Sequence, residues 1–493
     1  MPASRFRRIG TILLSGAAAC SLASCSAVPG GSSIAAGTPI TPAEAQEGAQ
    51  YHPQFVAEFG GAVTGPQATY VEQVGKNIAV QSGLANSQSA FNVTLLNSSV
   101  NNAFAVPGGY VYVTRQLVGL MNNEAELAGV LGHEVGHVAA RHSARRQQTA
   151  QRNQILGVLG QVLSGVLLGD TAIGRLGSEL ASTAPQLATL QYSRSQELEA
   201  DQLGVDYLQG AGYDPRAMST VLQSLAAQTA LDARLQGTDA TVPEWASTHP
   251  DPASRVSNAA RLAGQATGLT NRDTFLTRID GLMYDDDPAH GVIDGNSFIH
   301  PELRLSFSVP QGFYMINGAS AVSVNGDSGR AQFSTATYGG DLDTYITQVF
   351  QSLGGDTPLA PQAIQRTTVN GLSAAYGTAR VASGQQSVDV VVFAYEFSRN
   401  QAYHFAAITP AGGASVFNPL FNSMRRLSAA EANEVVPRQI DVVTAGRGDT
   451  VKTLAGRMAY TTGQVERFRV LNGLSASEQI VPGQMYKIVV RGS

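Results

Sequence analysis

The sequence predicts a multidomain protein. A mainly α-helical domain with a small β-sheet is followed by an α/β domain and a small βααβ module. Helical periodicity dominates from about residue 67 to 265, and the β-rich run FNVTLLNSSVNNAFAVPGGYVYVT at 91–114 interrupts it. Alternation typical of strands begins after YDDDPAHG, which reads as a linker, and VVPRQ at 435–439 marks a second boundary.

The composition supports several cores and excludes one class of partner. Apolar residues make up 43% of the 493 residues, so sizeable cores are available, while charged residues reach only 14%. The net charge of -5 gives no basic field, so we expect no nucleic-acid partner.

The N-terminus has the pattern of a targeting segment. Three arginines within the first eight residues precede the apolar stretch IGTILLSGAAACSLA, which is too short to span a bilayer. LASC, ending at Cys25, resembles a bacterial lipobox. This resemblance implies a signal peptide at 1–24, lipid on Cys25 and membrane attachment through it. An ordinary cleavage site with an incidental cysteine is the alternative.

The residues after Cys25 suggest where the protein resides. Ser26 follows the cysteine, which under the usual lipoprotein sorting pattern implies the outer membrane of a Gram-negative cell, facing the periplasm. Residues 25–50 are rich in Pro, Gly and small side chains and are expected to form a flexible tether. The apolar stretch at 155–169 is shorter than a membrane span, so we expect a helical hairpin that packs on the protein or dips into the membrane interface.

A metal-binding pattern lies in GVLGHEVGHVAARH at 129–142. The pair Asn123 and Glu126 is a capping-box pattern that opens a helix of about 25 residues. His133 and His137 then lie one turn apart on one face and can hold one ion, for which zinc is the best match. Glu134 is turned away from the metal by about 100° and can reach a water beside it.

A third ligand is expected from a second helical pattern, YSRSQELEADQLGVDYL at 192–208. Glu197 and Asp201 share a face of that helix, whereas Glu199 points elsewhere. Glu197 would complete a two-His, one-Glu site, and Asp201 would accept a hydrogen bond from the outer nitrogen of a ligand histidine. His142, five residues past His137, is interpreted as a surface or capping residue.

The segments GHEVGHVAARH and YSRSQELEADQLG together resemble the HtpX-like and BepA-like zinc metallopeptidases, relatives of the CaaX prenyl proteases. NNAFAVPGGYVYVTRQLV at 101–118 and STHPDPASRV at 247–256 also match that family's pattern. The resemblance covers about residues 50 to 265. It implies a zincin-type domain at 51–270 with one zinc ion per chain, held by His133, His137 and Glu197.

The same resemblance implies the catalytic roles. Glu134 becomes the general base that activates water at the metal, and Asp201 supports the ligands. His249 and Arg255 are implied as further catalytic residues near the open metal position. There His249 could act as an inhibitory ligand or, swung away, stabilise the oxyanion, with Arg255 supporting the same developing charge. Protein and peptide substrates would pair in extended form along the edge near residues 103–106.

Two further domains follow. Residues 437–491 resemble a LysM domain in GDTVKTLA, VLNGL and VPGQMYKIVV, and the resemblance implies binding of peptidoglycan; a module that only packs on its neighbour is the alternative. Residues 290–430 resemble PsbP-like α/β folds in LSFSVPQGF and VNGLSAAYGTAR and are expected to dock partners.

Three functions fit these patterns. The first is a zinc metalloendopeptidase that hydrolyses unfolded or misassembled envelope proteins. The second is a peptidase that cuts peptidoglycan cross-link peptides. The third is a non-catalytic assembly factor that works through docking surfaces, with the outer-membrane assembly machinery as its partner.

Overall fold

The structure is a computed structural model that describes residues 38–85, 88–143, 145, 192–236, 249, 252–354, 359–383 and 386–492. The chain divides into two units, Met1–Ile34 and Ala35–Ser493, and the description below concerns the second. Cys25, the signal peptide and the stretch 155–169 lie outside the described residues. Among the residues that are described, no helix is long and apolar enough to cross a membrane.

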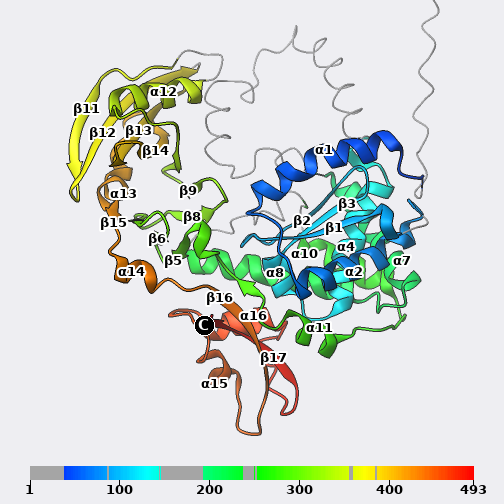
Figure 1. Ribbon diagram of the computed structural model, residues 1–493. Helices are drawn as coiled ribbons and strands as arrows, with labels where there is room; N and C mark the ends of the chain where they lie inside the picture. The colour runs from blue at the N-terminus through cyan, green and yellow to red at the C-terminus, as the bar shows by residue number, and fades with distance from the viewer. Residues whose placement is uncertain are drawn as a thin grey trace, which may run out of the picture. The chain divides into compact units, whose positions relative to one another are not determined.

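The first region consists of helices around a small sheet (Figure 1). In the three-stranded sheet the strand order is β1-β3-β2; β1 runs parallel to β3, and β2 runs antiparallel to it. The elements are α1 (Pro42–Glu58), α2 (Pro66–Ala79), β1 (Asn92–Leu96), β2 (Ala103–Val106), β3 (Tyr110–Thr114), α3 (Arg115–Leu120), α4 (Glu124–Ala139), α7 (Arg194–Gly210), α8 (Ala217–Gln236), α10 (Pro252–Ala263) and α11 (Arg272–Ile279).

Helix α1 begins inside the range that was expected to be a tether. Thr41 accepts a hydrogen bond from the Glu44 backbone N–H, and the Glu44 side chain returns one to the Thr41 backbone, so a complete capping box starts the helix. Gly48 lets α1 lie directly on the β2–β3 turn, because a Cβ there would lie 2.5 Å from the Pro107 carbonyl oxygen. Residues 42–50 are therefore part of the folded region.

Helices α4 and α7 pack closely because small residues face each other. Gly132 and Gly136 of α4 and Gly204 of α7 lie at this contact. A Cβ on Gly204 would lie 3.2 Å from the His133 backbone nitrogen and 2.5 Å from Met218 Cε. The close approach brings the side chains of the two helices within reach of one metal ion.

The middle region is rich in β-structure. A seven-stranded antiparallel sheet has the order β11-β12-β13-β14-β10-β9-β8, and a four-stranded sheet has the order β15-β7-β6-β5. Its elements are β5 (Val292–Asp294), β6 (Ser297–His300), β7 (Leu305–Ser308), β8 (Tyr314–Asn317), β9 (Val322–Gly326), β10 (Gly329–Thr335), α12 (Leu342–Gly354), β11 (Ile364–Val369), β12 (Leu372–Ser383), β13 (Gln386–Ser398), β14 (Gln401–Pro410), α13 (Asn418–Ser423), β15 (Arg425–Arg426) and α14 (Ala429–Asn433).

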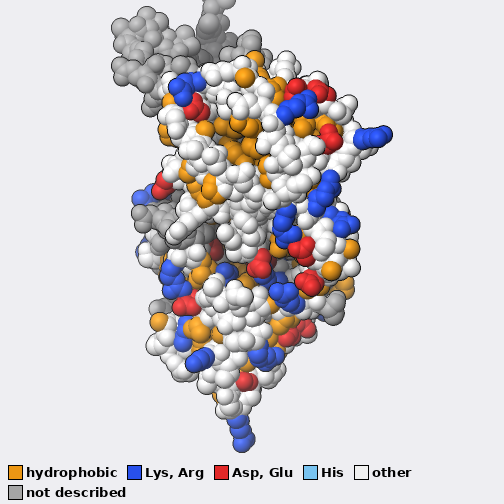
Figure 2. All heavy atoms as spheres, turned by 90° about the vertical axis from the view of Figure 1, so that its left-hand side faces the viewer, with side chains coloured by type: hydrophobic (Ala, Val, Ile, Leu, Met, Phe, Trp, Pro, Cys, Tyr) orange, Lys and Arg blue, Asp and Glu red, His pale blue; other side chains and the backbone are white. Residues whose placement is uncertain are grey.

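Strand alternation gives this region two cores of its own. Val391, Phe393 and Tyr395 of β13 join an aromatic core with β6 and β7, whereas Val390 and Val392 face the helix α12. Figure 2 views a face on which the upper part, at the height of this region, exposes apolar side chains between charges of both signs.

The C-terminal region has the order strand, helix, helix, strand: β16 (Arg438–Thr444), α15 (Val451–Ala455), α16 (Gln464–Leu471) and β17 (Met485–Arg491). β16 pairs antiparallel with β17 and also with β4 (Met283–Tyr284), which lies where a linker was expected. The apolar side chains of the C-terminal region, including Phe468 and Ile488, belong to the same core cluster as those of α2, α4 and α8.

The aspartates after β4 form an ordered junction. Asp286 accepts hydrogen bonds from Ser99 Oγ at 2.6 Å and from the Ile293 N–H at 2.8 Å. Asp285 accepts one from the Tyr460 hydroxyl at 2.7 Å. The segment that reads as a linker is thus bonded to residues of all three regions, and the expectation of a simple linker was wrong.

Candidate metal centre

Helix α4 carries the two histidines of the metal-binding pattern. Asn123 caps the helix by accepting from the Glu126 N–H at 2.9 Å, while the Glu126 side chain accepts from the Asn122 N–H at 2.7 Å. The helix ends at Ala139 after 16 residues, so the expected length of about 25 was too long. Arg141 has a φ of 54°, a left-handed conformation that ends a helix.

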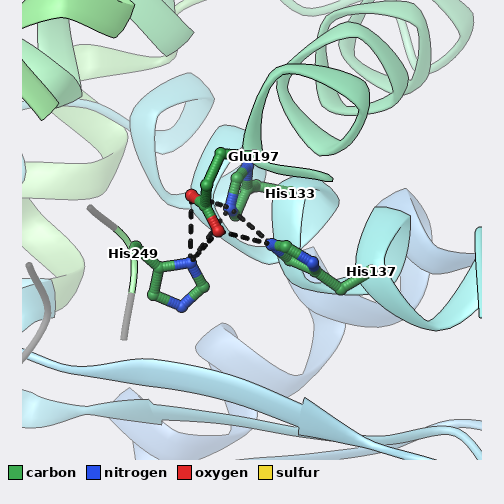
Figure 3. A group of neighbouring side chains, drawn as sticks. All are labelled: His133, His137, Glu197 and His249. Atoms are coloured by element: carbon green, nitrogen blue, oxygen red, sulfur yellow. Dashed lines mark hydrogen bonds and ion pairs between the residues drawn. The ribbon is translucent and has the colours of Figure 1, made fainter. Parts of the chain in front are cut away.

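Four buried side chains converge beside this helix (Figure 3): His133, His137, Glu197 and His249. Their potential ligand atoms all lie within 4.8 Å of one another. His133 Nε2 is 3.0 Å from His137 Nε2, and Glu197 from α7 approaches these nitrogens to 3.6 and 3.4 Å. The Nε2 atoms of both histidines and the carboxylate of Glu197 therefore point at one position.

His249 is the fourth member of the cluster. Its Nδ1 lies 3.1 Å from Glu197 Oε1 and 3.4 Å from His133 Nε2, so this nitrogen faces the ligand position. Its Nε2 lies 3.4 Å from Glu134 Oε1. A histidine expected near the open position thus points one nitrogen toward the ligands and the other toward Glu134.

Asp201 and Arg255 lie behind the ligands. Asp201 Oδ1 is 3.0 Å from His133 Nδ1, the ring nitrogen that faces away from the cluster. Arg255 donates to Asp201 through Nε at 2.8 Å and Nη2 at 2.5 Å, and to Glu197 through Nη1 at 2.5 Å. The guanidinium therefore bridges the two carboxylates of α7 and fixes their positions relative to each other.

These contacts set the charge states. Burial alone would raise the pKa of Glu197, but the charge of His249 and hydrogen bonds with His133 and His137 hold it below its usual range. Burial also opposes ionisation of Asp201, yet its hydrogen bonds with Arg255 and His133 lower its pKa to about 2. Both carboxylates are therefore negative at neutral pH, as a cation site requires.

Glu134 differs from these two carboxylates. It is 1% exposed, and burial raises its pKa. Among the described residues, Glu134 Oε1 has no hydrogen-bond partner. A buried carboxylate with a raised pKa is suited to take up a proton and release it.

One residue of the site was misinterpreted from the sequence. His142 was expected at the surface or as a cap, but it is fully buried, and its Nδ1 lies 2.8 Å from His137 Nδ1. Tyr192 stacks on the His137 ring at a centroid distance of 3.8 Å. The spacing of five residues gave no signal for His142, because its position depends on the break after α4.

The donor set fits zinc. Two imidazoles and one carboxylate from two packed helices are the usual protein ligands of a catalytic zinc, and all three are fully buried with their donor atoms converging. Residues 66–263 match the profile of peptidase family M48. This segment is an M48 peptidase domain. His133, His137 and Glu197 form its zinc site, of the kind typical of M48 peptidases.

Known proteins resemble part of the chain. The beta-barrel assembly-enhancing proteases of Escherichia coli O157:H7 and Yersinia pestis are 33% and 36% identical over 224 and 200 residues. Those matches cover 44% of both chains in the first case, and 40% of this chain and 39% of the relative in the second. The mitochondrial metalloendopeptidase OMA1 of Arabidopsis thaliana is 36% identical over 137 residues, 28% of this chain and 26% of its own. The chain spans less than half the length of these relatives.

Proposed function

We propose that the whole protein is a zinc metalloendopeptidase that hydrolyses unfolded or misassembled proteins of the cell envelope. The observation that carries this proposal is the fully buried cluster of His133, His137 and Glu197 with the buried carboxylate of Glu134 beside it. Its Oε1 faces the imidazole of His249 and accepts no hydrogen bond from the described residues. A buried carboxylate oxygen that accepts no hydrogen bond from the described residues costs stability, and a purely structural cluster would not need one.

Zinc, when bound, polarises the scissile carbonyl and makes a water acidic enough to attack at neutral pH. Glu134 takes the proton of the attacking water and delivers it to the leaving amine. Asp201 holds His133 through Nδ1, and Arg255 fixes the carboxylate of Glu197, so both keep their ligand atoms aimed at one point. On this geometry Arg255 is a positioning residue.

His249 supplies a restraint on activity. Its Nδ1 faces the ligand cluster at the distances given above, where an imidazole can serve as a fourth ligand. In that place it excludes the attacking water and keeps the peptidase latent. His249→Ala should then raise the basal cleavage of unfolded substrates; unchanged activity together with unchanged zinc affinity contradicts this role.

Substrates bind as an added strand. β2 stands at the end of the sheet order and α4 packs against it, so an extended peptide beside Ala103–Val106 would lie near the metal ligands. Backbone pairing of this kind tolerates many side chains and selects for extended segments. Unfolded proteins and mobile loops provide such segments, whereas compact folded domains do not.

The expected location of the protein limits the substrates that it can meet. The lipobox-like segment ending at Cys25 favours an outer-membrane lipoprotein facing the periplasm of a Gram-negative cell. The relatives named beta-barrel assembly-enhancing proteases favour envelope proteins as substrates and an outer-membrane assembly machinery as a partner. Cys25→Ser should release the protein from membranes into the soluble fraction, and continued membrane binding contradicts the lipid anchor.

A second candidate is a peptidase for peptidoglycan cross-link peptides, which the LysM-like residues 437–491 favour. Purified protein should be assayed on denatured casein and on muropeptides, with Glu134→Gln as the matched control. Cleavage of casein alone, lost in the variant, supports the first function, and cleavage of muropeptides alone supports the second. Zinc binding without hydrolysis of either substrate supports a non-catalytic assembly factor.

A further inference from the structure

The break after the active-site helix is held by contacts from the N-terminal helix. Arg141 adopts the left-handed conformation at φ 54°, which is unfavourable for a non-glycine residue. Its guanidinium donates to the carbonyls of Thr38 and Pro39 at 3.1 Å each and forms an ion pair with Glu44 of α1. These contacts hold a conformation that the local sequence alone does not favour.

The break turns His142 back toward the metal ligands. On an uninterrupted helix, residues five apart lie about 140° apart around the axis, so the two rings would diverge. Here His142 is buried, and its Nδ1 reaches His137 Nδ1 at 2.8 Å. The strained residue between them thus makes the contact possible.

The second ring nitrogen of His142 also has a partner. His142 Nε2 lies 3.2 Å from Glu199 Oε2, and Arg145 donates to the same oxygen at 2.9 Å. Since a carboxylate only accepts, His142 Nε2 donates, and its Nδ1 is left as an acceptor.

This arrangement determines the proton position on His137. With His142 Nδ1 as the acceptor, His137 carries its proton on Nδ1 and presents the lone pair of Nε2 to the ligand position. His133 reaches the same state by a different route, because Asp201 Oδ1 lies directly at its Nδ1. Each ligand histidine therefore has its outer nitrogen engaged, one by a carboxylate and the other by an imidazole that a carboxylate orients.

We propose that His142 is a positioning residue of the zinc site, which together with Glu199 fixes the tautomer and orientation of His137. The inference rests on the zinc site formed by His133, His137 and Glu197, and it does not depend on what the protein cleaves. Loss of the His142 imidazole should weaken zinc retention, since partners of ligand histidines typically contribute about 10- to 100-fold in metal affinity.

The test measures zinc dissociation from the full-length, zinc-loaded protein into a chromogenic chelator. His142→Leu removes the acceptor and should raise the dissociation rate about 10- to 100-fold. His142→Asn keeps an acceptor oxygen near the place of Nδ1 and should stay much closer to the wild-type rate. Glu199→Gln still accepts from Nε2 and should change little, whereas Glu199→Leu should follow His142→Leu in direction.

His404→Leu is the matched control. His404 is also buried and bonded through both ring nitrogens, to the Tyr345 hydroxyl at 2.8 Å and Ser334 Oγ at 3.2 Å, but it lies in the seven-stranded sheet. Its loss should lower stability and leave zinc dissociation unchanged. The comparison separates a lost ligand partner from a general loss of packing.

The visible spectrum of the cobalt-substituted protein gives a second readout without substrate. His142→Leu should shift the cobalt bands through a changed His137 bond, and His142→Asn should restore most of the shift. Wild-type zinc dissociation and cobalt spectra in both His142→Leu and Glu199→Leu overturn the proposal. If His142→Leu does not fold, Glu199→Leu, at a half-exposed side chain, decides alone. A protein that retains zinc normally but cleaves nothing contradicts the proposed peptidase and leaves this inference standing.

Discussion

The C-terminal region and the middle region are both β-containing additions to the peptidase domain, but they are built in different ways. The side chains of β16, α15, α16 and β17 share one apolar core with the helices around the zinc site. The middle region buries its side chains in two cores of its own, on the two faces of the seven-stranded sheet. The C-terminal region is therefore more closely joined to the catalytic helices than the middle region is.

A single buried lysine shows how close this connection is. Lys487 of β17 is fully buried and donates to the carbonyls of Gly119 at 2.8 Å and Leu120 at 3.2 Å, as well as to that of Met121. These carbonyls end α3 and directly precede the cap of α4. The C-terminal strand thus satisfies the end of one helix and borders the start of the helix that carries the zinc ligands.

The largest expected effect is the loss of hydrolysis in variants of the zinc site, which variants of the middle region should not show. His133→Ala and Glu197→Ala should lose zinc and all hydrolysis, and Glu134→Gln should keep zinc while the rate falls by about 10²- to 10⁴-fold. His404→Gln, in the middle region, should leave both unchanged at neutral pH. Zinc content and casein hydrolysis measure these outcomes. A Glu134→Gln protein that cleaves at the normal rate removes Glu134 from the mechanism.

Two buried phenylalanines test the shared core. Phe468 of α16 lies in the core around the zinc site, and Phe405 of β14 lies in the core of the middle region. Replacing either by Ala should cost about 3–5 kcal/mol. Only Phe468→Ala should lower the temperature at which zinc is released to a chelator during heating. Equal zinc-release temperatures in the two variants contradict the difference between the regions.

Lys487→Met should cost about 3 kcal/mol of unfolding free energy. The substitution leaves the carbonyls at the end of α3 without their donor and removes the positive charge that interacts with the buried Glu126. Adding Glu126→Gln should recover part of the loss. Denaturant unfolding of the two single variants and the double variant measures the coupling, and simple additivity contradicts it.

The smallest effect concerns pH and the middle region alone. Burial lowers the pKa of His404 to about 4 from 6.5. The unfolded chain therefore binds more protons between these values, so the stabilising contribution is complete above pH 6.5 and is lost as the pH falls toward 4. The loss should reach about 3 kcal/mol. His404→Gln should flatten the pH dependence of the unfolding free energy. An unchanged slope between pH 6.5 and 4 would show that other groups cause this dependence.

The parts of the site that were predictable are those with local causes. The spacing of His133, Glu134 and His137 sets their positions on one helix, and the spacing of Glu197 and Asp201 does so on another, so the zinc site followed from helical geometry and the resemblance. The early end of α4 could not be predicted from local sequence, because Arg141 is held in its conformation by residues about a hundred positions away. The position of His142 follows from that break and was missed for the same reason.

The domain organisation could likewise be predicted only in part from the sequence. The alternating strands of the middle region and the strand, helix, helix, strand order at the C-terminus were visible as sequence patterns. The pairing of β4 with β16 and the shared core of the C-terminal region depend on contacts between segments more than 150 residues apart. Alternation shows which side chains are buried, but it does not show against which neighbours.

The most direct test of the zinc peptidase is a metal titration. Protein stripped of metal by a chelator is supplied with increasing zinc, and the hydrolysis of denatured casein is measured at each step. Hydrolysis should be absent without zinc and rise to a plateau at one equivalent per chain, and His137→Ala should show no rise. Full activity of the metal-free protein, or a plateau that His137→Ala also reaches, contradicts a peptidase built on this site.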